Sequence, residues 1–329
     1  MPQDIEFAMP FPVRTSPDMD AARARSLVWT RERGLITGPA DEKRVTGWDI
    51  AGLMARWAPD AVGAGLDLIV NGVVLITMLD DQFDSPQGRD PHQAARIHDH
   101  LVALSRPGGN TAPQGPLACA LKEVWDTIFA GTSPEWAQRT SEHHRWYLDS
   151  SLDEARNRHH QRTPSREGYF TQRHRGSGYV YPMLDMSQKA YGFELPTAAF
   201  QSPAICQMME ITAEFIDVVN DVHSLEKEEA RGQERDNLVH VIMHETGCGR
   251  TQAIAEIARM ADRIVGQFVK LEDQTGDDPL TQRFVDCMRA AMSGYLEWSR
   301  TTARYARHAQ LAPARGPAYG DLLAPEARR

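Results

Sequence analysis

The chain has 329 residues, of which 41% are hydrophobic, and a formal net charge of −9. A chain of this length can bury a large core, in one large domain or in two small ones. The negative charge argues against nucleic acid or an anionic membrane surface as the main partner, so we expect a small-molecule partner.

The first half of the chain carries residues that are typical of helix starts and stops. Its opening, MPQDIEFAMPFPVR, is broken by prolines and lacks the apolar core of a signal peptide. Ser16-Pro17-Asp18 is typical of a helix start, and Gly34 is typical of a stop. The apolar run at residues 68–79 is far short of a membrane span. These features predict a soluble cytoplasmic protein.

The second half continues in the same way. Residues 107–116 (PGGNTAPQGP) predict a loop between helices. Ser133-Pro134-Glu135 indicates the start of a polar helix that runs to about Arg162, and residues 205–219 keep helical spacing. Strand patterns of period two are nearly absent, and no linker divides the chain. We therefore predict an all-α protein with a single domain.

Cysteine and histidine are not predicted to bind metal. The four cysteines are scattered without a CxxC pair, which indicates buried thiols in a reducing cytosol. The histidine pairs lie in polar stretches and are expected to be exposed, whereas His223 could line a site without binding metal. These pairs are His98 with His100, His143 with His144, and His159 with His160.

Two clusters of oxygen-bearing side chains follow apolar runs, DDQFD at residues 80–84 and NDVHSLEKE at residues 220–228. Residues four apart lie on one face of a helix, so each cluster projects its oxygen atoms together. Carboxylate, hydroxyl and amide oxygens suit Mg²⁺ or Mn²⁺ rather than zinc or copper. Two such half-sites can hold several cations, whose natural shared ligand is a diphosphate. The predicted metal ligands are Asp80, Asp84, Asn220, Ser224 and Glu228.

The alternative interpretation is a solvated helix face, which is the usual setting of acidic residues at this spacing. Both clusters, however, come directly after apolar runs, where core helices emerge. Carboxylates crowded at the mouth of an apolar core repel one another and resist desolvation unless cations compensate them. The presence of both clusters favours the metal site.

The clusters resemble the signature motifs of bacterial class I terpene synthases. DDQFD matches the DDxxD motif, and NDVHSLEKE matches the NDxxSxxKE form of the second metal motif. The resemblance extends to a late Arg304-Tyr305 and is strongest to the branch of pentalenene synthase and bacterial cineole synthase. It implies one helical domain, residues 1–329, around a deep apolar pocket. In that domain residues 1–15 would cap the site and residues 306–329 would form a tail.

The resemblance also assigns roles within the motifs. Asp80 contacts metal, Asp84 takes the helix-facing position, and Asp81 is a partner for a basic residue on closure. Asn220, Ser224 and Glu228 are the metal contacts of the second motif. The implied cofactor is Mg²⁺, with three ions, and Mn²⁺ can substitute. Metal ions that bridge an allylic diphosphate act as Lewis acids, so no nucleophile or base need start the reaction.

Basic residues are expected to complete the diphosphate-binding site. Lys227 lies inside the second motif, and Arg304 with Tyr305 matches the C-terminal Arg-Tyr pair of the family. Arg173 resembles the arginine that senses diphosphate. The stretch after it is longer than usual, which leaves Arg175 as an alternative sensor.

A helix break is expected at residues 176–178, because glycine adopts φ values that other residues avoid. Family members often carry aromatic residues just before DDxxD, whereas residues 75–79 here are LITML. We expect a wider, less aromatic cavity on that side, with cation stabilisation from residues 179–181; the alternative is that residues 75–79 simply pack a core helix. The predicted pocket residues are Ile76, Thr77, Phe83, Gly176, Ser177, Tyr179 and Trp298.

The resemblance implies Mg²⁺-dependent ionisation and cyclisation of a linear prenyl diphosphate. Farnesyl diphosphate, giving a cyclic sesquiterpene hydrocarbon or alcohol, is the first expectation; geranyl and then geranylgeranyl diphosphate follow. A chain-elongating prenyltransferase would carry a second DDxxD where this chain has NDVHSLEKE, and a non-catalytic helical protein would have no use for inward carboxylates. We expect a monomer or homodimer without nucleic acid or membrane partners.

Overall fold

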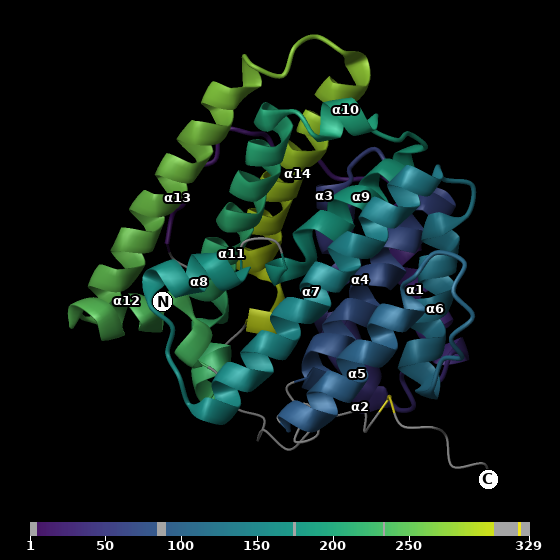
Figure 1. Cartoon of the computed structure of the whole chain (residues 1–329), viewed down its shortest axis with the longest axis horizontal. Helices are drawn as coiled ribbons and strands as arrows, with labels where there is room; N and C mark the ends of the chain where they lie inside the picture. Colours follow the sequence, from purple (N-terminus) through teal and green to yellow (C-terminus); the bar gives the residue numbers. More distant parts are fainter. Residues whose placement is uncertain (1–4, 84–89, 174–175, 233, 306–321, 324–329) are drawn as a thin grey trace.

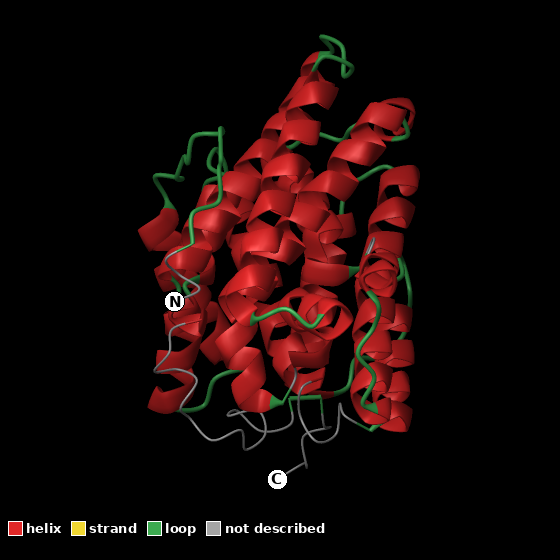
Figure 2. Cartoon of the chain, turned by 90° about the vertical axis from the view of Figure 1, so that its left-hand side faces the viewer, coloured by secondary structure: helices red, strands yellow, loops and turns green. Residues whose placement is uncertain are grey.

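The computed structural model describes residues 5–83, 90–173, 176–232, 234–305 and 322–323, and within these ranges the chain forms helices and no strand (Figure 2). The predicted all-α architecture is confirmed. The α-helices are α1 (Met19–Glu32), α2 (Pro39–Trp48), α3 (Ile50–Trp57), α4 (Gly63–Phe83), α5 (Pro91–Leu104), α6 (Gly115–Phe129), α7 (Pro134–His160), α8 (Arg166–Arg173), α9 (Val180–Tyr191), α10 (Thr197–Phe200), α11 (Pro203–Arg231), α12 (Leu238–Thr246), α13 (Arg250–Glu272) and α14 (Pro279–Thr301). Short 3₁₀ turns are η2 (Ser177–Tyr179), η3 (Glu234–Asp236) and η4 (Ala303–Tyr305).

The helices assemble around one continuous apolar core. Figure 1 shows α12 and α13 along one side of the bundle and α1 and α6 along the other. In the middle, α4 packs against α1, α3, α6 and α9, while α11 packs against α13 and α14. These two central helices carry the two oxygen-bearing clusters, so the bundle brings together segments that are far apart in sequence.

Local signals placed some helix ends correctly and others only approximately. Helix α1 begins at Met19 with Asp18 as its N-cap, so Pro17 precedes the helix and does not occupy its predicted first position; Gly34, at φ 65°, follows the helix as expected. Helix α7 begins at Pro134, one residue after Ser133, whose hydroxyl accepts from the backbone of Trp136. Proline at the first helical position needs no partner for a missing N–H, which is why such sequences begin helices.

Helix α4 is long and apolar enough to cross a membrane by length and composition. Most of it, however, is buried inside the bundle, as expected for the core helix of a globular fold. It packs between α1, α6 and α9 and ends at the first cluster. Its apolar character is therefore explained by burial in this core.

Two expectations about side-chain exposure were wrong. His143 and His144 are buried, at 2% and 1% exposed, because they lie on the inner face of α7, where Nδ1 of His143 lies 2.6 Å from the Asp185 carboxylate. Of the four cysteines, Cys287 is buried while Cys119 is exposed. The local sequence of α7 is polar, so it did not indicate that some of its polar side chains point inward and contact residues of α9.

The N-terminal segment lies against the outside of α11, α13 and α14. Phe7 is buried, with its ring centroid 5.9 Å from that of His223, and Phe11 packs edge-on against Phe268 at 5.5 Å. The hydroxyl of Ser293 donates to the carbonyl of Pro12 at 3.4 Å. The described residues of this segment do not line the pocket defined below. Its predicted capping of the site stays a prediction.

Candidate active site

A pocket opens between α3, α4, α7, α9, α11 and α14. Along α4 the pocket lining changes from Val73 and Ile76 to Asp80, and along α11 it changes from Ile216 to Asn220. With a rise of 1.5 Å per residue, the α4 side chains span roughly 10 Å. The pocket therefore combines an apolar part with an oxygen-rich end, where α4 and α11 approach their C-termini.

Arg304 and Tyr305 connect the two motifs at that end. Nη2 of Arg304 lies 2.8 Å from Oδ2 of Asp80 and 3.8 Å from Oδ1 of Asp81. The amide nitrogen of Asn220 donates to the hydroxyl of Tyr305 at 2.6 Å. Two consecutive residues of η4 thus contact the first and the second motif. The expected basic partner of Asp81 is present, and it lies closer still to Asp80.

Hydrogen bonds orient the side chains of the second motif. The amide nitrogen of Asn220 also donates to the hydroxyl of Tyr295 at 2.7 Å, which leaves its amide oxygen as the donor atom for a cation. Ser224 donates to Oε1 of Glu228 at 2.5 Å, and Asn237 donates to the other carboxylate oxygen at 2.9 Å. These contacts fix the rotamers of groups that line the pocket.

Asp221, the second residue of this motif, is fully buried and ties α11 to its neighbours. Its carboxylate accepts from the backbone N–H of Leu238 at 2.5 Å and from the hydroxyl of Tyr169 at 2.9 Å. Its backbone carbonyl accepts from the side chain of Asn237, the residue that caps α12, at 2.8 Å. Asp221 therefore links α11 to α8 and α12, while the residues around it face the pocket.

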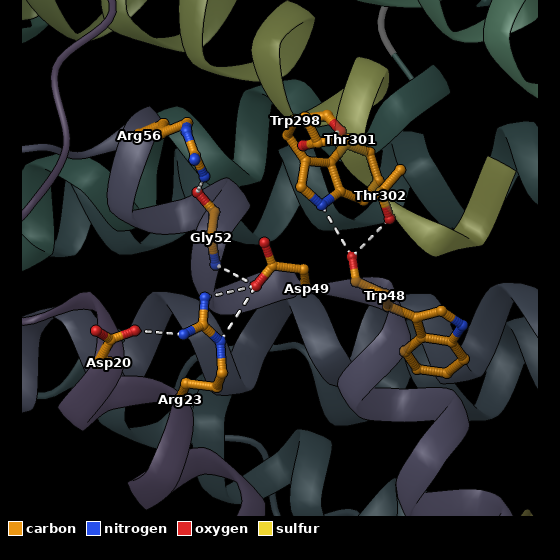
Figure 3. A network of polar contacts seen from close by, with 9 residues as sticks. All are labelled: Asp20, Arg23, Trp48, Asp49, Gly52, Arg56, Trp298, Thr301 and Thr302. Carbon is orange, nitrogen blue, oxygen red and sulfur yellow. Dashed lines mark hydrogen bonds and ion pairs between the residues drawn. The ribbon is translucent and has the colours of Figure 1, made fainter. Parts of the chain in front are cut away.

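A junction between α2 and α3 holds the chain that carries Arg304 (Figure 3). The carbonyl oxygen of Trp48 accepts hydrogen bonds from the indole of Trp298 at 2.8 Å and from the hydroxyl of Thr302 at 2.9 Å. The last carbonyls of a helix lack helical partners, so these bonds also cap α2. The Arg304 guanidinium lies over the Trp48 ring, 5.4 Å from its centroid.

Asp49 gives this junction its shape. It has a φ of 51°, in the left-handed region, between the end of α2 and the start of α3. Its carboxylate accepts from the backbone N–H of Gly52 at 3.2 Å and from Nη2 of Arg23 at 2.8 Å, as Figure 3 shows. A Cβ atom on residue 52 would lie 2.0 Å from this carboxylate, so a larger residue there would displace the Asp49 side chain from its hydrogen bond. Arg23 also contacts Asp20 of α1.

The helix break predicted at residues 176–178 is confirmed. Helix α8 ends at Arg173, and the 3₁₀ turn η2 precedes α9. Gly178 has a φ of 66° and Tyr179 a φ of 59°. The left-handed region is natural for glycine and rare for a bulky residue. Both residues line the pocket, so the irregular backbone lies in its wall.

The structure leaves some predicted residues undescribed. Asp84 and Arg175 lie outside the described residues, and Arg173 and Ser177 are described only by their backbone, at the end of α8 and in η2. The roles predicted for these residues stay predictions.

Most other predicted residues line the pocket, namely Ile76, Thr77, Asp80, Gly176, Tyr179, Asn220, Ser224, Lys227, Glu228, Trp298, Arg304 and Tyr305. Phe83 is buried but does not line it, because it packs into the core about one turn beyond Asp80. Tyr181 and His223 are likewise buried and absent from the lining.

Sequence reasoning missed several lining residues, namely Tyr147, Ser150, Ser151, Glu154, Asp217, Asp236 and Tyr295. A signal for those on α7 existed, because Tyr147, Ser151 and Glu154 recur at the spacing of one helix face. Tyr295 likewise lies three residues before Trp298 on α14. Without knowing which face of each helix turns inward, these patterns could not be distinguished from ordinary packing.

Burial makes the pocket tyrosines weaker acids. It raises the pKa of Tyr305 to about 12, against the opposing effect of the neighbouring Arg304 charge. Burial also raises the pKa of Tyr147, Tyr179 and Tyr295 well above the usual range. Their hydroxyls therefore stay protonated at neutral pH and act in hydrogen bonds rather than as anionic bases.

The donor set fits a hard divalent cation. Asp80, Asn220, Ser224 and Glu228 line one pocket and offer oxygen atoms alone, the chemistry that Mg²⁺ prefers. Within the described ranges, no three His, Cys, Asp or Glu side chains gather into a metal cluster by themselves. Two of the four proposed donors, Asn220 and Ser224, contribute an amide and a hydroxyl oxygen. A cation bound here would therefore not need three such side chains.

The chain is similar to known proteins over most of its length. The family model described as terpene synthase family 2, C-terminal metal binding, matches residues 73–267. Pentalenene synthase from Streptomyces avermitilis is 34% identical over 319 residues, covering 93% of this chain and 94% of the relative. A β-caryophyllene synthase from Saccharothrix espanaensis, named as cyclising (2E,6E)-farnesyl diphosphate, is 29% identical over 336 residues, covering 98% and 94%.

A solved structure shows the same similarity in three dimensions. The crystal structure of germacradien-4-ol synthase from Streptomyces citricolor superposes with a TM-score of 0.80 at 30% identity. The match covers 91% of this chain and 99% of that one. The helical arrangement around the pocket is thus shared with that protein.

Proposed function

Since the chain belongs to terpene synthase family 2 and is a class I terpene synthase, we propose that it cyclises farnesyl diphosphate to a cyclic sesquiterpene, hydrocarbon or alcohol. The observation that carries this proposal is the position of Asp80, Asn220 and Arg304 at one end of a pocket that also has an apolar part. That part is lined by Ile50, Leu53, Val73, Ile76, Met183 and Ile216. A prenyl diphosphate has matching parts, a charged head and an apolar chain. The caryophyllene synthase relative, named for farnesyl diphosphate, supports the choice of chain length.

The proposed metal ligands are Asp80, Asp84, Asn220, Ser224 and Glu228. We assign Mg²⁺ to them, with three ions, and Mn²⁺ can substitute. A bound divalent cation supplies Lewis-acid neutralisation of the charge that develops on the leaving diphosphate. Asn220 donates hydrogen bonds to the hydroxyls of Tyr295 and Tyr305, and Asn237 donates to Glu228. These bonds preorganise the proposed ligands, which lowers the cost of holding them in position.

The basic residues of the site bind and orient the diphosphate. Arg304 offers planar donors that match phosphate oxygens, and Lys227 adds a second positive charge from α11. Tyr305 supports this end of the pocket through Asn220. Arg173, with Arg175 as the alternative, is the proposed sensor at the end of α8. Together these residues hold the leaving group away from the apolar walls.

The walls shape the reaction after ionisation. Ile76 and Thr77 form an aliphatic side, while Tyr179 and Trp298 present aromatic side chains that attract a cation. Exclusion of water by these residues prevents early capture of a reactive carbon centre. Geranyl diphosphate is the second candidate substrate, and geranylgeranyl diphosphate becomes the substrate if the less aromatic α4 side enlarges the cavity. Chain elongation is disfavoured because the second motif has the form NDVHSLEKE.

The same proposal extends to the organisation of the chain. We assign residues 1–329 to one cytoplasmic domain that acts as a monomer or homodimer. Residues 1–15 would cap the site; of the described residues of this segment, Phe7 contacts His223 of α11 and the carbonyl of Pro12 accepts from Ser293 of α14. Residues 306–329 are assigned as a tail, and Leu322, one of its two described residues, donates its backbone N–H to Oε1 of Gln82 at 3.1 Å.

Incubation of the purified protein with Mg²⁺ and, separately, geranyl, farnesyl and geranylgeranyl diphosphate tests the proposal. Products are identified by gas chromatography with mass spectrometry, and EDTA provides the metal-free control. A cyclic C15 product from farnesyl diphosphate alone is expected. A terpene from another substrate would correct the chain length, and longer diphosphates formed with added isopentenyl diphosphate would overturn cyclisation in favour of prenyl transfer.

A further inference from the structure

A buried hydrogen bond links the pocket wall to α7. Tyr179 lines the pocket, and its hydroxyl lies 2.7 Å from Nδ1 of His144. Both side chains are buried, at 4% and 1% exposed. Tyr179 is the last residue of η2, directly before α9, whereas His144 comes from the middle of α7. The contact therefore joins the irregular wall segment to a regular helix on another side of the pocket.

Aromatic rings enclose this pair. The imidazole of His144 meets Trp125 and Phe129 of α6 edge-on, with centroids 5.4 and 6.5 Å away. The Tyr179 ring packs edge-on against Tyr147 at 5.0 Å. Burial lowers the pKa of His144 to about 3, so the ring is neutral at physiological pH. A neutral imidazole nitrogen can accept the phenol proton.

The backbone explains why this tyrosine needs a fixed partner. Tyr179 has a φ of 59°, which a bulky side chain rarely adopts, and it follows Gly178 in the same left-handed region. Tyr179 ends the short 3₁₀ turn η2 and is the N-cap of α9, so it lies outside the hydrogen-bonded turns of an α-helix. The contacts of the side chain itself, with His144 at the hydroxyl and Tyr147 at the ring, therefore hold Tyr179 in the pocket wall.

We propose that His144 is a positioning residue for cyclisation, which acts by fixing the ring of Tyr179 in the pocket wall and keeping its hydroxyl directed into the protein. This inference rests on the proposed function. A fixed ring keeps the same aromatic surface beside a passing cation. A released tyrosine would turn its ring or bring its hydroxyl oxygen into the pocket, where the oxygen can capture or deprotonate a cationic intermediate.

The test compares His144→Phe, Tyr179→Phe and the double variant. His144→Phe keeps an aromatic ring between Trp125 and Phe129 but removes the acceptor, while Tyr179→Phe keeps the ring and removes the hydroxyl. Each single variant is expected to change the product ratio and to lower kcat by about tenfold, with KM nearly unchanged. The double variant should be no worse than either single variant, because all three lack the same bond.

Two further variants separate positioning from simple packing. His144→Asn places an acceptor oxygen near the position of Nδ1 and should restore part of the native product ratio, which His144→Phe does not. His160→Phe changes an exposed histidine of the same helix and should match the native protein. Tm values of the single and double variants give a readout without substrate, and their shifts should be non-additive.

The outcomes distinguish the two proposals. If the native protein and His160→Phe give the same terpene and His144→Phe also gives it at the native rate, the positioning role is wrong while the function stands. Additive Tm shifts with additive changes in product ratio would also overturn it. If the native protein forms no terpene from any of the three diphosphates, the proposed function fails and the positioning role fails with it.

Discussion

Arg304 and Asp80 form an ion pair across 224 positions of the sequence, with Nη2 of the arginine 2.8 Å from Oδ2 of the aspartate. The arginine side chain is 9% exposed and that of the aspartate 47%, so the cation is held by the protein while the carboxylate reaches solvent. Tyr305, the next residue, contacts Asn220. The C-terminal turn η4 is thereby placed to bind the head group of a substrate shared by both motifs.

Replacing Arg304 should impair turnover more than stability. Arg304→Gln removes a positive charge and planar donors from the proposed diphosphate site, and the expected loss in kcat/KM is about 10²- to 10³-fold. Steady-state kinetics with farnesyl diphosphate measures it. Arg300→Gln, which changes an exposed arginine at the end of α14, is the matched control. Equal activity of the two variants would contradict the assignment of Arg304.

Glu228→Gln should weaken the response to Mg²⁺. Its carboxylate lines the pocket and accepts from Ser224 and Asn237, so loss of the charge removes a proposed metal ligand from an oriented set. The Mg²⁺ concentration for half-maximal activity should rise by about tenfold or more. Glu226→Gln, on the same helix but outside the pocket lining, should leave the Mg²⁺ titration unchanged. Superimposable titrations of the two variants would refute the ligand assignment.

Aromatic substitution on α4 should change the product. Ile76→Phe or Thr77→Phe adds volume and a π face to the aliphatic side of the pocket. We expect an altered product ratio or a rate about tenfold lower, measured by gas chromatography and kinetics. Val62→Phe, at an exposed position, is the control. A variant with native product and native rate would show that these two residues only pack the helix.

The Asp49 junction should contribute to stability. Asp49→Ala removes the cap on Gly52 and a partner of Arg23, so unfolding in urea should become easier by about 1–2 kcal/mol. Arg23→Gln should cost less than about 1 kcal/mol, because the two charged side chains are 36% and 31% exposed and screened by solvent. If the arginine variant proved the more destabilised, the cap would not be the main contribution.

Acid should destabilise the native protein partly through His144. Folding depresses its pKa from the usual 6.5 to about 3, so its contribution to stability is complete above about pH 6.5 and is lost as the pH falls toward 3. Between pH 7 and pH 5 the loss is about 2 kcal/mol. His144→Phe should lose correspondingly less stability over this range in urea unfolding.

His100 and His223 provide an internal control for this pH experiment. Burial lowers the pKa of both, and both are present in the native protein and in His144→Phe, so their contributions cancel in the comparison. Parallel stability curves for the two proteins between pH 7 and pH 5 would contradict a buried neutral His144.

Local patterns predicted much of the fold and part of the site. Residues 80–83 of the first motif and the whole second motif lie on helices as their spacing indicated, α7 begins at Pro134, and the helix breaks at Gly178. Each of these features depends on backbone geometry within a few residues, such as the fixed φ of proline or the freedom of glycine. The same reasoning failed for His144, because the polar sequence around it does not show which face of α7 is buried.

The sequence by itself determined the helical class, and its two motifs determined the family. It also indicated that the side-chain oxygens within each motif share a helix face, because a helix fixes the spacing of residues three and four apart. The tertiary structure alone decided that Arg304 contacts Asp80, that the Trp48 carbonyl holds the end of α14, and that His144 meets Tyr179. Such contacts join helices far apart in the chain. They depend on how whole helical faces pack together, which no local spacing specifies.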